Sequence, residues 1–208
     1  MIFVLLMWDV IFQPIEGAFE TPYQSAPLDF NTDAFAISRS AEIRARLSMI
    51  EQTDVCLSML KETDDRERPQ KTWAVGCRWD AFPQKDLLEI AECLGGPSLS
   101  VVCQIFCEEW EHCSSGLPDL CIWSHRSHAE EEEEKEKAGE ASSAALVEVH
   151  EHKAEGKVKA KKPENRVRFV EVKGPGDKLR ENQILWIDLL LRANIEVEVA
   201  YVTEKKKP

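Results

Sequence analysis

The sequence predicts an α/β fold in which a mixed central sheet is flanked by helices. Three observations support this prediction. Residues 166–173 and 195–202 alternate apolar and polar side chains with the period of a strand, and the short apolar run at 120–123 is also typical of a strand. Most of the remaining chain places apolar residues at helical spacing. With 208 residues, 43% of them hydrophobic, the chain can bury one core.

The first segment, Met1 to Phe12, is apolar except for Asp9, and we expect it to form a buried helix. It is too short to span a bilayer, and it lacks the basic stretch and cleavage site of a signal peptide. No membrane association is therefore expected. A chain that begins inside a buried helix is typical of a fragment, so we expect one N-terminally truncated domain over residues 1–208.

The middle of the chain is predicted to be helical. After a proline-rich connector at 14–31, a helix is expected from Ser38–Ser40 to about Lys61, followed by a charged, solvated loop at 63–71. Residues 73–82 favour neither helix nor strand. A helix at 84–94 should end at Gly95-Gly96, and the next should begin at Pro97 and end near Cys113.

Strands and a helix complete the fold after this point. The segment 129–165, between the first two strands, opens with consecutive glutamates and contains no Phe, Trp or Tyr. It cannot bury enough apolar area to offset its ordering entropy, so it is predicted to be a disordered acidic insert in a hairpin. A regulatory or interaction tract is the alternative. A helix at about 178–193 and the strand at 195–202 follow.

Cysteine usage and charge limit the functional classes. Seven cysteines, an odd number without a CxxC pair, indicate reduced thiols. Cys103, Cys107 and Cys113 with His112 could form a zinc cluster, but thiols on the core face of a helix are favoured. The net charge of -12 argues mildly against DNA binding. This objection weakens if the acids lie in a metal site and the acidic tract, or if a larger parent protein supplies the basic surface.

The residues that indicate chemistry lie at strand ends. Asp119 opens one strand, and Glu171 and Lys173 end another. Since side chains alternate, Glu171 and Lys173 face one side and Val172 faces the other. If the strands pair antiparallel, Asp119 meets Glu171 across the ladder. Two adjacent carboxylates repel unless a cation lies between them. Removing either acid should therefore leave the metal-free protein equally or more stable.

This arrangement predicts a metal-dependent phosphodiesterase. Mg²⁺ or Mn²⁺ on oxygen ligands can bind a phosphate oxygen and activate water, and a lysine ammonium can stabilise charge that develops on the phosphate. Glu-x-Lys at a strand end is by itself more often a solvated edge, so an acidic interaction module is the competing interpretation. Trp73, Trp79, Trp110 and Trp186 could stack on DNA bases, although packing in or beside the core is favoured for each.

Several motifs together resemble a known family. They are Gly116–Leu120 (GLPDL), Val170–Pro175 (VEVKGP) and Asp177–Leu179 (DKL), followed by Gln183 and Trp186. They resemble the VRR-NUC domain, a branch of the PD-(D/E)xK nuclease superfamily, and most closely that of the Fanconi-anaemia-associated nucleases. The resemblance covers almost the whole chain outside the acidic insert. It implies a restriction-endonuclease-like core and a structure-specific DNA nuclease, which cuts 5′ flaps and trims DNA 5′ to 3′ during interstrand cross-link repair in the nucleus.

The resemblance also implies residue roles. Asp119, Glu171 and the backbone carbonyl of Val172 would be ligands of Mg²⁺ or Mn²⁺, and Lys173 would be the catalytic lysine. Flap or branched DNA would be the partner, and Fanconi-pathway proteins would bind through regions that this sequence lacks. Family proteins carry a further metal-binding glutamate upstream, which no residue here matches. We therefore expect weak or no cleavage by this chain alone, and a catalytically incomplete DNA- or protein-binding module is the alternative.

Overall fold

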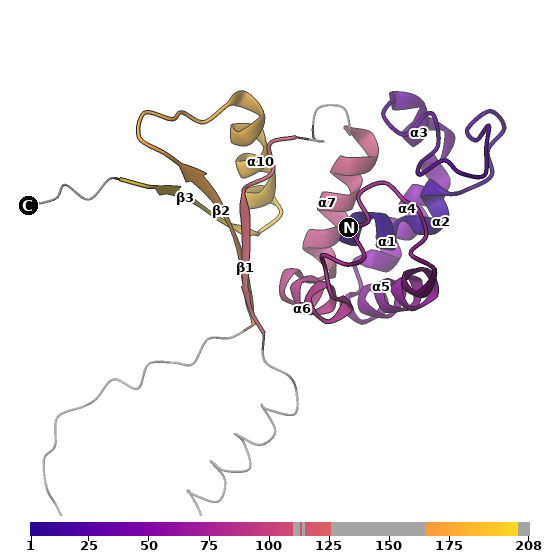
Figure 1. Cartoon of the computed structure of the whole chain (residues 1–208), viewed down its shortest axis with the longest axis horizontal. Helices are drawn as coiled ribbons and strands as arrows, with labels where there is room; N and C mark the ends of the chain where they lie inside the picture. Colours follow the sequence, from indigo (N-terminus) through magenta and orange to yellow (C-terminus); the bar gives the residue numbers. More distant parts are fainter. Residues whose placement is uncertain (110–112, 114, 126–164, 204–208) are drawn as a thin grey trace, which may run out of the picture.

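The structure, a computed structural model, describes residues 1–109, 113, 115–125 and 165–203. Figure 1 shows a group of helices beside a sheet, with α7 on the side of the helical group that faces the sheet. The helical group consists of α1 (Ile2–Leu6), α2 (Trp8–Ile11), α3 (Asp33–Ser38), α4 (Ser40–Ile50), α5 (Thr53–Glu67), the 3-10 helix η1 (Arg68–Gln70), α6 (Gln84–Leu94) and α7 (Gly96–Glu108). The sheet group consists of β1 (Leu120–Ser124), β2 (Arg166–Lys173), α10 (Glu181–Arg192) and β3 (Glu196–Tyr201).

The sheet has three strands in the order β1-β2-β3. β1 pairs antiparallel to β2 with Leu120 opposite Val170, and β2 pairs parallel to β3 with Arg168 opposite Glu196. Parallel neighbours need a crossover connection, which α10 supplies. The predicted mixed sheet flanked by helices is confirmed, and the three predicted strands lie within about one residue of their expected bounds.

The buried residues form two clusters that meet at Phe106 of α7. The larger cluster fills the helical group and includes most of Met1 to Phe12, as expected, although this segment forms two short helices rather than one. The smaller cluster packs Trp186 and Leu190 of α10 against α7 and the sheet. Phe106 lies 5.2 Å from Trp186 and 5.0 Å from Phe3, measured between ring centroids. The sheet is thereby fixed to the helical group.

The single helix expected from about residue 38 to 61 is wrong, because the chain breaks between α4 and α5. The start of α7 occupies the break. A Cβ atom on Gly96 would lie 2.3 Å from the carbonyl oxygen of Ile50, so only glycine fits this approach. The Gly96 N–H donates to Thr53 Oγ1 at 3.0 Å. A contact between segments distant in sequence therefore sets the end of α4.

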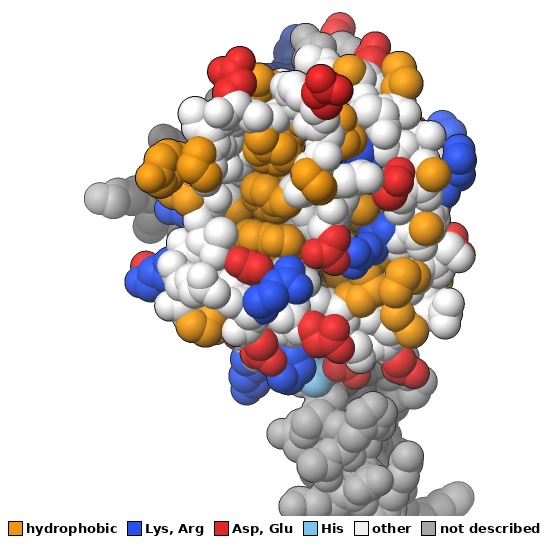
Figure 2. Space-filling view, turned by 90° about the vertical axis from the view of Figure 1, so that its right-hand side faces the viewer, with side chains coloured by type: hydrophobic (Ala, Val, Ile, Leu, Met, Phe, Trp, Pro, Cys, Tyr) orange, Lys and Arg blue, Asp and Glu red, His pale blue; other side chains and the backbone are white. Residues whose placement is uncertain are grey.

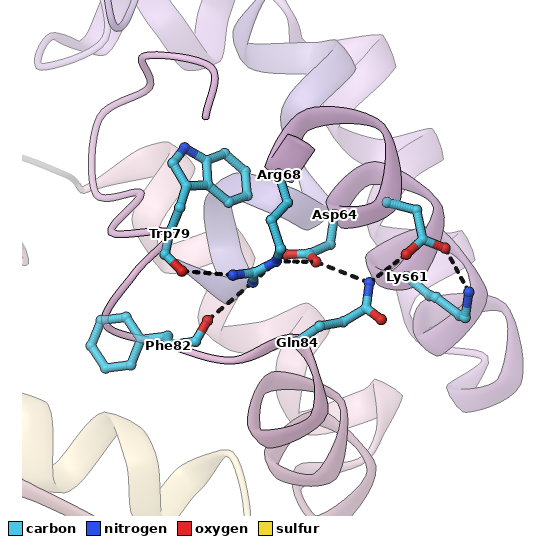
Figure 3. Close-up of polar contacts among 7 residues, drawn as sticks. Lys61, Asp64, Arg68, Trp79, Phe82 and Gln84 are labelled. Carbon is cyan, nitrogen blue, oxygen red and sulfur yellow. Dashed lines mark hydrogen bonds and ion pairs between the residues drawn. The ribbon is translucent and has the colours of Figure 1, made fainter. Parts of the chain in front are cut away.

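The solvated loop predicted at 63–71 is also wrong, since α5 continues to Glu67 and Asp64 is buried. Arg68 donates from Nε and Nη2 to the two carboxylate oxygens of Asp64, at 2.6 and 2.7 Å. It also donates to the carbonyl oxygens of Trp79 at 2.7 Å and Phe82 at 3.0 Å, as Figure 3 shows. These charges pair inside the fold rather than with water, and they hold the loop 71–83, which contains neither helix nor strand.

Other predicted elements are confirmed with shifted ends. α6 matches its predicted bounds, α7 begins one residue before Pro97, and α10 begins three residues later than expected. The predicted acidic insert lies outside the described residues except for Asn165, as do Trp110 and His112. In the described part of the chain, no single helix has the length and apolar character to cross a membrane; α6 and α7 meet that test only as a pair bent by 103°.

Candidate active site

The pairing of β1 with β2 brings two predicted acids together. When the register of Leu120 with Val170 is extended by one residue, Asp119 lies opposite Glu171. Asp119 Oδ2 accepts the backbone N–H of Val172 at 2.9 Å. Its other oxygen, Oδ1, makes no hydrogen bond or ion pair with the described residues, and the side chain is exposed to solvent. The carboxylate of Asp119 is thus anchored at one oxygen and accessible at the other.

Glu171 and Lys173 face the same side of β2, as the strand period predicts. Both side chains are buried, with 1% and 9% exposed, respectively. Lys173 Nζ lies 2.8 Å from Glu171 Oε1. The sequence argument treated Glu171 mainly as a repelled neighbour of Asp119. In the structure its charge is compensated by a buried ammonium group, which changes the effect expected of its removal.

Gln183 joins the two charged groups. Its Nε2 donates to Glu171 Oε1 at 2.6 Å, and its Oε1 accepts from Lys173 Nζ at 2.9 Å. The same oxygen accepts the backbone N–H of Arg180, the N-cap residue of α10, at 3.0 Å. In the sequence, Gln183 is noted for its place in the first turns of the helix that follows the strand, and through the family resemblance. Its link to Lys173 and Glu171 is decided by the tertiary structure.

A close backbone contact positions Asp119 relative to α10. Gly116 has φ +97°, and a Cβ atom there would lie 2.9 Å from the carbonyl carbon and oxygen of Asn182. The Asn182 side chain donates to Ser115 Oγ at 3.0 Å. The loop that leads to Asp119 therefore packs on the first turn of α10, which also carries Gln183. One helix end positions both halves of the site.

The donor atoms fit a hard divalent cation. Glu171 Oε2 is buried and has no hydrogen-bond partner among the described residues, and an unpartnered buried carboxylate oxygen is costly unless a cation or donor meets it. Oxygen ligands of this kind suit Mg²⁺ or Mn²⁺. No group of three or more Asp, Glu, His or Cys residues in the described ranges is placed to hold a metal ion. The two carboxylates are therefore the acidic donors that the described chain offers.

The alternative zinc cluster is not supported. Cys103, Cys107 and Cys113 are all buried and unpaired by disulfides, as the core interpretation predicted. Burial raises the pKa of Cys107 to about 12 and that of Cys103 well above its ordinary value. No group of three or more His, Cys, Asp or Glu residues in the described part of the chain is placed to hold a metal ion. His112 lies outside the described residues.

The profile of the VRR-NUC domain family matches residues 58–204, which is more than half of the chain. The chain belongs to the VRR-NUC family. It is 32% identical over 206 residues to the Fanconi-associated nuclease 1 homolog of Schizosaccharomyces pombe, covering 99% of this chain and 24% of the relative. It is 33% identical over 208 residues to the Dictyostelium discoideum homolog, covering 99% and 17%. The chain thus spans less than a quarter of these relatives.

A solved structure of a related nuclease has the same fold. The crystal structure of paFAN1 bound to DNA with a 2-nucleotide 5′ flap and a gap superimposes with a TM-score of 0.72 and 25% identity. The match covers 100% of this VRR-NUC chain and 31% of the paFAN1 chain. The predicted family and the restriction-endonuclease-like fold class are confirmed, and so is the assignment to a nuclease-domain family. The metal ligands and the catalytic lysine remain predictions.

Proposed function

We propose that this VRR-NUC domain hydrolyses phosphodiester bonds in DNA with a divalent ion, Mg²⁺ or Mn²⁺, held by Asp119, Glu171 and the backbone carbonyl of Val172. One observation carries the proposal: Glu171, buried opposite Asp119 and beside Lys173, keeps one carboxylate oxygen without a partner among the described residues. When bound, the ion would act as a Lewis acid toward the phosphate and lower the pKa of a bound water.

Lys173 is proposed to stabilise the transition state. Its ammonium is held between Glu171 Oε1 and Gln183 Oε1, at 2.8 and 2.9 Å, so its position is fixed before substrate arrives. It can donate to a phosphate oxygen as negative charge accumulates there. Because the side chain is largely removed from water, its electrostatic effect is stronger than at an exposed position. Gln183 is a positioning residue in this scheme, since it contacts the two charged groups rather than the substrate.

The substrate class follows from the relatives. We propose that flap or branched DNA is the substrate, cut at 5′ flaps and trimmed 5′ to 3′. The support is the 5′ flap DNA bound by paFAN1 and the name Fanconi-associated nuclease given to the relatives. From the family resemblance we also propose nuclear interstrand cross-link repair, with partners in the Fanconi pathway. This chain spans 24% and 17% of the two relatives, so the activities of the whole relatives are proposals here.

A catalytically incomplete DNA- or protein-binding module is the second candidate. The observation that favours it is the absence, in the described ranges, of a third Asp, Glu, His or Cys close enough to complete a metal site. With only two carboxylates the ion would retain mostly water ligands, and its occupancy at ordinary Mg²⁺ concentration would be low. Such a domain would bind DNA or a partner without cutting.

A metal titration combined with cleavage separates the candidates. Mn²⁺ binding is measured by calorimetry and cleavage on a labelled 5′ flap duplex, for the wild type and for Asp119→Asn, Glu171→Gln and Lys173→Ala. The two acid variants should lose Mn²⁺ affinity and cleavage together. Lys173→Ala should keep most of its Mn²⁺ affinity while cleavage falls by about 10²- to 10³-fold, the usual effect of removing one transition-state donor.

An exposed carboxylate elsewhere on the sheet provides the control variant. Glu198→Gln changes an exposed carboxylate on β3, which pairs with Arg168 at 3.2 Å, and should leave both measurements unchanged. Wild-type cleavage by Asp119→Asn or Glu171→Gln would refute the assigned ligands. DNA binding without any cleavage, even at saturating Mn²⁺, would favour the binding module.

A further inference from the structure

The loop between η1 and α6 carries an exposed tryptophan. Trp73 is 76% exposed, whereas Trp79 and Trp186 are buried. Core packing, which the sequence favoured for all of these residues, is therefore wrong for Trp73. A large aromatic ring exposed to water loses the stabilisation of burial. A single exposed ring is common on protein surfaces, so the surroundings of Trp73 decide whether it can bind a ligand.

The loop holds the ring in a defined place. Thr72, which precedes it, donates from its hydroxyl to Glu67 Oε2 at 2.7 Å, and its carbonyl accepts from Trp79 Nε1 at 2.9 Å. Two residues after the ring, the Val75 N–H donates to the carbonyl of Ser25 at 2.9 Å. The Arg68 contacts drawn in Figure 3 hold the far end of the loop at Trp79 and Phe82. The backbone on both sides of Trp73 is thus anchored, which reduces the entropy lost on binding a ligand.

Trp73 borders a cavity of about 360 Å³, within the size range of small-ligand pockets. Two cations, Lys71 and Arg78, and one carboxylate, Asp80, line it. The rings of Trp73 and Trp79 and the thiol of Cys77 line it as well. Burial raises the pKa of Cys77 to about 11, so this wall is uncharged. Lys71 pairs with Asp80 at 2.7 Å, while the Arg78 side chain makes no ion pair or hydrogen bond with the described residues.

We propose that this cavity binds an unpaired nucleobase of single-stranded DNA, with the base stacked on Trp73 and an adjacent phosphate beside Arg78. Every base has a π face, so an aromatic ring with a neighbouring cation recognises single strands regardless of sequence. A 5′ flap is such a strand, and paFAN1, which shares this fold, was solved with flap DNA. The site requires no metal ion and no cleavage, and therefore stands or falls separately from the proposed nuclease activity.

The charge of the chain makes the stacking contact more important. Figure 2 shows acidic and basic side chains interspersed over one face of the helical group, with hydrophobic side chains between them. With a net charge of -12, the chain as a whole repels phosphate. Affinity for a single strand must then depend on contacts to bases more than on general electrostatic attraction, and this dependence can be measured.

The test compares a thymidine decamer with an abasic decamer that has the same number of phosphates. Binding is followed by fluorescence anisotropy at low salt in EDTA, so that no cleavage occurs. The wild type should bind the thymidine decamer more tightly. Trp73→Ala should weaken this binding by about 5- to 150-fold, the range for one base on one aromatic ring, without affecting the abasic decamer. Trp73→Phe should restore part of the difference.

Two control variants distinguish base stacking from phosphate contacts and from nonspecific binding to exposed aromatic rings. Arg78→Ala should weaken both decamers by the same factor, because a phosphate contact does not distinguish them. Tyr23→Ala removes another aromatic ring, 85% exposed, and should change neither. The proposal is overturned if the wild type does not prefer the thymidine decamer, or if Trp73→Ala binds it normally. It is also overturned if Trp73 is needed only for binding a proline-rich peptide titrated in parallel, which would make the cavity a protein-docking site.

Discussion

Glu171→Ala should destabilise the metal-free domain, contrary to what the sequence alone predicted for either acid. Replacing this side chain leaves Lys173 buried without its counter-charge, and breaking a buried ion pair in this way usually costs about 3–5 kcal/mol. It also leaves Gln183 Nε2 without its acceptor at 2.6 Å, a loss of about 1–3 kcal/mol.

One feature of the wild type offsets part of this cost. Glu171 Oε2 is already buried without a partner in the described part of the chain, so its removal recovers some of the desolvation penalty. A net loss of about 3 kcal/mol is therefore expected. Asp119→Ala should change stability by only about 1 kcal/mol, because Asp119 is exposed and water can replace its contact with the Val172 N–H.

Urea unfolding in EDTA, followed by tryptophan fluorescence, measures the difference. For an m-value of about 1–3 kcal/mol per M, the midpoint of Glu171→Ala should fall by roughly 1–3 M. The double variant Glu171→Leu with Lys173→Met should be more stable than Glu171→Ala, since it buries no unpaired charge. Excess Mn²⁺ should raise the midpoint of the wild type and not that of Glu171→Ala.

A Glu171→Ala protein as stable as the wild type in EDTA would refute this reasoning. It would show that repulsion from Asp119 outweighs the pair with Lys173, as the sequence argument supposed. A double variant no more stable than Glu171→Ala would show that the buried charge of Lys173 is not the source of the loss.

Three further predictions concern the supports of the site and the core. Gly116→Ala should lower the free energy of unfolding by about 1–3 kcal/mol, because its Cβ would collide with the Asn182 backbone at positive φ. It should also weaken Mn²⁺ binding, measured by calorimetry. Unchanged Mn²⁺ affinity would show that this contact does not position Asp119. Arg68→Ala removes the ion pair of the buried Asp64 carboxylate and leaves it the hydrogen bond from Gln84 Nε2. Protease should then cut the 71–83 loop faster than in the wild type, and equal cutting rates would contradict the role of Arg68. Burial raises the pKa of Cys56 to about 11 and of Cys107 to about 12, from 9.0. The folded state thus retains protons that the unfolded state loses, and the urea midpoint should fall as pH rises from 9 toward 11; a midpoint that is constant over this range, or falls equally in Cys107→Ala, would contradict it.

Local patterns in the sequence were enough for the strands and for the central pair of the site. Alternation along 166–173 placed Glu171 and Lys173 on one face. Asp119 was expected opposite Glu171 on the condition that the two strands pair antiparallel, and the structure supplies this pairing. The Gly95-Gly96 pair ended α6 where expected. These features depend on strand period and backbone conformation, which neighbouring residues set.

Tertiary contacts decided the features that no local pattern encodes. Gly96 separates α4 from α5 by approaching the Ile50 carbonyl. Arg68 pairs with the buried Asp64, in a charged segment that was expected to be a solvated loop. Gln183 joins Lys173 to Glu171 from a different element. By itself, the sequence determined which residues form strands and which faces they share, because these depend on short-range periodicity. Only the tertiary structure decided which polar groups find partners, because donors and acceptors distant in sequence must meet within about 3 Å.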